Sequence, residues 1–133
     1  MAKGLEKHRE RLEALNRFGK DLTRRCGAKC ELCEASGVSL RVYEVQPTPV
    51  VPEIERCIFV CVACGDSLER PKKLDRDHWR CAAQSVWSEV PAVQVLSARL
   101  LRRLGETEMW AREALENVYL DEDVEAWVSE ASV

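Results

Sequence analysis

Cys30-Glu31-Leu32-Cys33 and Cys61-Val62-Ala63-Cys64 are two cysteine pairs with the same spacing, and 27 residues (34–60) separate them. A spacer of two residues lets both sulfurs of a pair point at the same ion, so two such pairs can complete a tetrahedron of thiolates. The spacing therefore predicts one structural Zn²⁺ bound by Cys30, Cys33, Cys61 and Cys64. Because four protein ligands leave no position for water or substrate, such a site contributes free energy of folding rather than catalysis.

The segments around the two pairs predict a small sheet followed by a helix. Residues 38–45 alternate and are rich in β-branched side chains, which is typical of a strand. The prolines of residues 46–52 predict a loop, and residues 56–60 return as a second strand. The second cysteine pair then runs into residues 65–70, which can continue as a helix. Cysteine pair, hairpin, cysteine pair and helix follow one another in the order of a treble-clef zinc finger.

Helical patterns surround this centre. Residues 4–25 carry leucines and a phenylalanine at helical spacing with charges between them, which predicts one amphipathic helix that ends before Gly27. The best-defined helix is expected to start within Ser88-Glu89-Val90-Pro91, because Pro91 lies near its first turn, and to end before Gly105. Three further helices are expected, running from Asp75 or Asp77 to about Trp87, from Thr107 to Tyr119, and onwards from Asp121.

The fold class expected from these elements is α+β, a treble-clef zinc finger with a small β-hairpin that is surrounded by four or five helices. We expect a single globular unit in three parts. These are an N-terminal amphipathic helix at residues 1–25, a zinc domain at residues 26–71, and a helical C-terminal part at residues 72–133 that packs on it.

The composition favours a soluble globular protein of one domain, since 46% of the 133 residues are hydrophobic and 32% are charged. No run approaches the roughly 18 apolar residues of a membrane span. The N-terminus is charged and lacks the apolar stretch of a signal peptide, so a cytoplasmic location is expected. There, the seven cysteines are expected to be metal ligands and free thiols rather than disulfides.

Charge is distributed unevenly along the chain. Residues 1–33 carry nine Lys and Arg against five Asp and Glu, whereas residues 105–133 carry nine Asp and Glu against one Arg. The basic end adjoins the first cysteine pair, where a nucleic acid or an acidic protein surface could bind. The alternative is that the basic and acidic ends attract each other, or that their charged side chains only form the solvated faces of separate helices. The candidate partner-binding residues are Arg17, Lys20, Arg24, Arg25 and Lys29.

The other cysteines leave alternatives open. Cys26 and Cys57 each precede a pair by four residues, a spacing similar to the iron–sulfur motif of radical S-adenosylmethionine enzymes, whose barrel a chain of this length can hardly supply. We expect both to pack as small hydrophobic residues, and Cys81 to lie in the core. If these thiols were exposed and reactive, a thiol or metal-homeostasis protein would be the alternative.

Histidine and tryptophan give few catalytic signals. His8 is expected to be solvated, and His78 to cap a helix or make a buried hydrogen bond. No Ser-His-Asp set or phosphate-binding glycine loop stands out. The four tryptophans, Trp79, Trp87, Trp110 and Trp127, fall at helical positions and are predicted to be core residues rather than a base-stacking or ligand-binding surface.

Residues 42–47 resemble the strand of HNH endonucleases that carries a histidine base and a following proline, with Glu44 in place of the histidine. A carboxylate with an ordinary pKa is a weaker base than imidazole near neutral pH. The alternative function that follows is a metal-dependent HNH-like nuclease, or a phosphoester or phosphonate hydrolase, that uses Glu44 and His78.

A closer resemblance is to the PhnA-like family, named for bacterial alkylphosphonate-utilisation operons. It covers roughly residues 24–128 and is carried by residues 29–33, 42–45, 74–81, 85–95 and 119–121, of which Trp87-Ser88-Glu89-Val90-Pro91-Ala92-Val93-Gln94 is the most specific. The resemblance implies the same four zinc ligands. Many members add a C-terminal SH3-like domain, which is not expected within these 133 residues.

The leading hypothesis is a non-enzymatic, zinc-stabilised interaction protein of the bacterial cytoplasm. We expect it to bind nucleic acid or a protein partner through its basic N-terminal face, and we expect no membrane partner.

Overall fold

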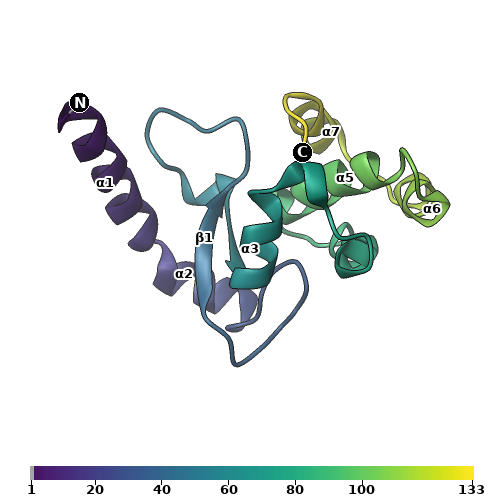
Figure 1. Ribbon diagram of the computed structural model, residues 1–133, viewed down its shortest axis with the longest axis horizontal. Coiled ribbons are helices and arrows are strands. Elements are labelled where there is room, and N and C mark those ends of the chain that lie inside the picture. The colour runs from purple at the N-terminus through teal and green to yellow at the C-terminus, as the bar shows by residue number, and fades with distance from the viewer. Residues whose placement is uncertain (1) are drawn as a thin grey trace.

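Two short strands form a hairpin at the centre of the chain, whose residues 2–133 are described by a computed structural model (Figure 1). Strands β1 (Leu40–Glu44) and β2 (Cys57–Cys61) pair antiparallel, with Leu40 opposite Cys61 and Glu44 opposite Cys57. This register puts the second cysteine pair at one end of the hairpin and Glu44 at the other. The protein is therefore a mixed helical and β structure, as the sequence predicts.

The N-terminal segment forms two helices where the sequence predicts one. Helix α1 (Ala2–Asn16) and helix α2 (Gly19–Cys26) are separated by a tight turn, in which the Phe18 N–H donates to the carbonyl of Leu15. The turn allows Leu15, Phe18 and Leu22 to pack with Cys57 of the sheet. The N-terminal part of helix α1 extends away from the rest of the chain in Figure 1.

The predicted apolar face of this segment is therefore only partly buried. Leu22 is fully buried, whereas Leu5 and Leu12 are 70% and 47% exposed. The helical pattern is present in α1, but its residues 4–10 are all exposed.

Helix α3 (Val62–Leu68) begins inside the second cysteine pair, because Cys61 occupies its N-cap and its sulfur accepts the N–H of Cys64 at 3.5 Å. A 3₁₀ turn (Pro71–Lys73) follows. The helix predicted up to about Trp87 is divided into a 3₁₀ turn (His78–Cys81) and a short helix α4 (Ala82–Ser85).

Helix α5 (Pro91–Leu104) is the centre of the C-terminal part and is buried along most of its length. It begins at Pro91, the last residue of the predicted start, and its predicted end before Gly105 is confirmed. Helices α4, α6 (Met109–Asn117) and α7 (Glu122–Ser129) pack against it. Asp121 caps α7, as predicted, by accepting the N–H of Val124 at 2.9 Å. The cap predicted at Thr107 is wrong, because α6 begins later and Glu108 occupies its N-cap without a side-chain hydrogen bond.

Arg99 of α5 ties the two halves together. Its side chain is buried and donates to the carbonyls of Gln46 and Trp127 at 2.5 Å and of Val128 at 3.2 Å. It joins the loop after β1 to the C-terminal end of α7, where a cation is also favoured by the helix dipole. Burial lowers the pKa of Arg99.

The four tryptophans differ in burial. Trp79 is fully buried, and Trp110 and Trp127 are partly buried against the core, as predicted. The prediction for Trp87 is wrong, since it is 59% exposed. It falls outside the core because α4 ends at Ser85, so the helical spacing that predicts its burial does not extend to it. Among residues 2–133, no helix has both the length and the apolar character needed to cross a membrane.

Candidate metal centre

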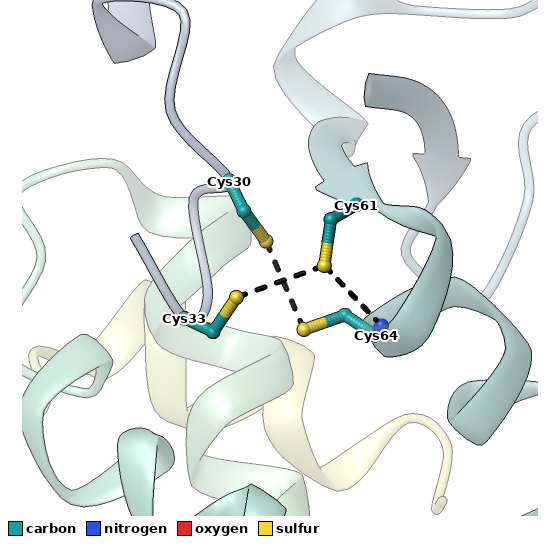
Figure 2. Close-up of side chains that lie close together, drawn as sticks. All are labelled: Cys30, Cys33, Cys61 and Cys64. Atoms are coloured by element: carbon teal, nitrogen blue, oxygen red, sulfur yellow. Dashed lines mark hydrogen bonds between the residues drawn. The ribbon is translucent and has the colours of Figure 1, made fainter. Parts of the chain in front are cut away.

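The four cysteines predicted as ligands come together from three segments. Cys30 and Cys33 lie in the turn after α2, Cys61 ends β2, and Cys64 lies in the first turn of α3. All four sulfurs lie within 4.8 Å of one another. Figure 2 shows them facing a common centre, with the sulfurs of Cys30 and Cys64 3.8 Å apart and those of Cys33 and Cys61 3.6 Å apart. This group could hold a metal ion.

Burial protects most of the site. Cys30, Cys61 and Cys64 are at most 5% exposed, whereas Cys33 is only partly buried. The cluster therefore has one side, at the first cysteine pair, that a solute can approach.

Glu31 attaches the first cysteine pair to the sheet. Its N–H donates to the carbonyl of Phe59, and its carboxylate accepts the N–H of Phe59 at 2.8 Å. Arg25 binds the same carboxylate in bidentate fashion, at 2.6 and 3.0 Å, and also donates to the carbonyl of Cys57 at 2.8 Å. The Glu31 side chain is 5% exposed, so this ion pair helps to place the two cysteine pairs side by side.

Before a metal binds, the four thiols cannot all ionise, because like charges at this distance repel one another. The hydrogen bond between the sulfurs of Cys30 and Cys64 lowers the pKa of Cys30 to about 4 and raises the pKa of Cys64 well above its usual range. Burial raises the pKa of Cys33 to about 11. At neutral pH the cluster therefore holds protons that a metal ion displaces on binding.

His78 belongs to this centre, which the sequence does not predict. Its Nε2 lies 3.2 Å from the sulfur of Cys64. Asp75 fixes the turn by accepting the N–H groups of Asp77 and His78 at 3.0 and 3.3 Å. A metal-bound thiolate can only accept a hydrogen bond, so Nε2 then carries the proton. His78 thus has the geometry of an outer-shell donor, a role that orients and tunes metal ligands.

The structure does not bring Glu44 and His78 together. Glu44 lies four residues along β1 from Leu40, the partner of Cys61, which corresponds to about 13 Å at the usual rise of a strand. Its carboxylate accepts two hydrogen bonds from Arg11, at 2.6 and 2.8 Å. The same guanidinium donates to two carbonyls of the hairpin loop, and its pKa is raised mainly by the bond to Glu44.

The candidate partner-binding residues are in two different situations. Arg25 is engaged with Glu31, as described above, and is therefore part of the internal scaffold. The other four are exposed on and beside α2, and of these Arg24 approaches Asp21 only at 3.9 Å, with both side chains exposed. They are Arg17, Lys20, Arg24 and Lys29.

The remaining cysteines stay outside the four-sulfur group. Cys57 is buried and Cys81 partly buried, and burial raises their pKa values to about 11 and 12. Cys26 is partly buried, and its S–H lies 3.7 Å from the carbonyl of Thr23. Because the thiolate is the nucleophile, Cys57 and Cys81 are poorly suited to thiol chemistry near neutral pH.

Comparisons of the chain with protein-family models, with curated proteins and with solved structures found no match.

Proposed function

We propose that the metal is one structural Zn²⁺ and that the cysteine centre is a treble-clef zinc finger of the HNH-like kind. A zinc ion about 2.3 Å from each of four sulfurs in a regular tetrahedron requires about 3.8 Å between sulfurs. The distances of 3.8 Å and 3.6 Å within the cluster fit this requirement. The order of turn, hairpin, turn and α3 supports the treble clef, and the segments that resemble the PhnA-like family support membership of that family.

The protein acts by binding rather than by catalysis. Zinc with four thiolate ligands has no open position for water or substrate. Glu44, the carboxylate of the nuclease or hydrolase alternative, is held by Arg11 and lies at the far end of the hairpin. These two features favour an interaction protein over the enzyme.

The partner is a polyanion, either a nucleic acid or an acidic protein surface, and it binds the basic N-terminal face. This face consists of the exposed side chains Arg17, Lys20, Arg24 and Lys29. The observation that carries the proposal is that four exposed cations lie on and beside α2, which leads into the turn of the first cysteine pair. Among residues 2–133, only Arg24 of these four forms an ion pair, with Asp21 at 3.9 Å. Held by a closed metal site, such a face binds without having to be ordered first.

Charge reversal tests the basic N-terminal face. A variant with Arg17, Lys20, Arg24 and Lys29 changed to Glu leaves the internal ion pair of Arg25 intact. Its affinity for labelled single-stranded RNA, single-stranded DNA and duplex DNA is measured by fluorescence anisotropy over a range of salt concentrations. We expect binding to be lost, or the slope of log K against log salt on single strands to fall by up to about 3.

The matched control carries the same change in net charge on another surface. It replaces the exposed Arg70, Lys72, Lys73 and Arg102 by Glu. We expect this control to keep most of the affinity. Equal losses in the two variants would show that only the net charge matters and would refute the assignment to the N-terminal face.

A further inference from the structure

A hollow of about 300 Å³ lies directly beside the first cysteine pair. Its lining comes from two segments. The first is the cysteine pair with Glu34, and the second includes Cys81, Gln84, Trp87 and Ser88, in the 3₁₀ turn, in α4 and in the turn after it. Small-molecule pockets range from about 300 to 1,000 Å³, so this hollow suits one planar group rather than a large ligand. We call it the Trp87 hollow.

Trp87 is presented to solvent from a fixed backbone. The backbone N–H of Trp87 donates to the carbonyl of Gln84 at 3.1 Å, and the backbone N–H of Ser88 donates to the carbonyl of Ser85 at 3.0 Å. The hydroxyl of Ser88 accepts the N–H of Val90 at 3.1 Å, which closes the turn. Although the backbone is held in this way, the indole is 59% exposed, so its burial adds little to folding. An exposed indole on a fixed backbone offers a flat face for stacking.

The basic N-terminal face leads to this hollow. Lys29 directly precedes Cys30, and the hollow is lined from Glu31 onwards. Figure 1 shows α2 running into the loop that carries this pair. A strand whose phosphates contact α2 and Lys29 therefore reaches the rim of the hollow at its next nucleotides.

The charges inside the hollow favour a base over a phosphate. Within residues 2–133 its lining has no Lys or Arg, and it includes the acidic residues Glu31 and Glu34. Glu31 is neutralised by Arg25, whereas Glu34 is exposed. A free carboxylate repels a phosphate but accepts hydrogen bonds from the N–H groups of a base edge, and the Gln84 amide adds both a donor and an acceptor.

We propose that Trp87 stacks on one unpaired base of a single-stranded nucleic acid, with that base in the Trp87 hollow and the adjoining phosphates on the basic N-terminal face. This inference rests on the proposed function and selects single-stranded nucleic acid among its polyanionic partners. Duplex DNA, whose bases are already stacked and paired, is expected to bind only through its phosphates.

The test uses two labelled oligonucleotides of equal length, one with bases and one abasic throughout, with the zinc-loaded full chain. Stacking of one base on an aromatic side chain changes affinity by about 5- to 150-fold. We expect Trp87→Ala to weaken binding of the base-containing strand by a factor in this range and to leave the abasic strand within about twofold. Trp87→Phe should recover part of the loss. Tyr119→Ala, which removes another exposed aromatic side chain far along the sequence, is the matched control and should bind both strands as the wild type does.

The outcomes distinguish base stacking on Trp87 from the binding of a polyanion by the basic N-terminal face. If the wild type binds the two strands equally well and Trp87→Ala changes neither affinity, the stacking site is refuted while binding to the basic N-terminal face stands. If the wild type binds neither strand, the stacking site and the nucleic-acid form of the proposed function are refuted together.

Discussion

Replacing His78 by Phe isolates the hydrogen bond between the imidazole and the sulfur of Cys64. Phenylalanine keeps a flat ring, which can retain the edge-on contact with Trp79, whose ring centre lies 4.8 Å from that of His78 at an angle of 84°. The substitution removes Nε2 and with it the donor 3.2 Å from the sulfur. The effect on metal affinity therefore measures mainly the hydrogen bond.

The expected loss of zinc affinity follows from the negative charge on the accepting sulfur of Cys64. A hydrogen bond to a charged group contributes about 1.5 to 3 kcal/mol, and about 1.4 kcal/mol corresponds to a factor of ten in an equilibrium constant. We expect His78→Phe to weaken zinc binding about 10- to 100-fold, which is the usual effect of losing an outer-shell partner. His78→Gln, which keeps a side-chain N–H donor, should lose less.

The assay is competition for zinc between the protein and a chromophoric chelator at fixed pH. His8→Phe is the matched control, because His8 is exposed on α1 and far from the cysteines in the sequence. Circular dichroism of the zinc-loaded variants checks that each is folded. A folded His78→Phe protein with zinc affinity within twofold of the wild type would refute a donor role for His78.

Two other predictions follow from the site. Zinc affinity should rise with pH between about 6 and 8. The pKa of Cys33 is raised to about 11 and that of Cys64 is also raised, so both thiols stay protonated at neutral pH and each proton competes with zinc. The chelator competition assay measures this dependence, and an affinity that falls as pH rises would contradict it. Arg25→Leu should lower the free energy of unfolding in urea by about 2 kcal/mol, a value reduced for partial exposure, because it leaves the carboxylate of Glu31 buried without its partner. Arg24→Leu, one position away, should change the free energy of unfolding by less than about 0.5 kcal/mol. Similar losses of stability in the two variants would mean that the ion pair between Arg25 and Glu31 does not stabilise the first cysteine pair.

Much of the centre could be predicted because its signals are local. Each cysteine pair is defined by a two-residue spacer, so Cys30, Cys33, Cys61 and Cys64 can be recognised without knowledge of the fold. Helix α5 is equally local, since Pro91 and its apolar spacing are enough to locate it. The hairpin follows from alternation and from the prolines between its strands.

The roles that the sequence does not reveal depend on contacts between distant segments. Arg25 looks like a surface cation in the sequence, and only the fold brings it to a buried Glu31. His78 reaches Cys64 through the path of the turns after α3, which no periodicity encodes. Trp87 fits a helical pattern, but α4 is too short to carry it into the core. For all three residues, the local sequence predicts the usual role of the residue type, whereas the packing of distant segments places the side chain in a different environment.

We expect the four thiolates to hold one zinc ion in a closed site. The most direct test is metal analysis of the untagged protein, purified without added metal, together with its visible absorption spectrum. We expect one zinc per chain and no visible absorption. Iron with a broad visible band, or a folded protein that contains no metal, would contradict it.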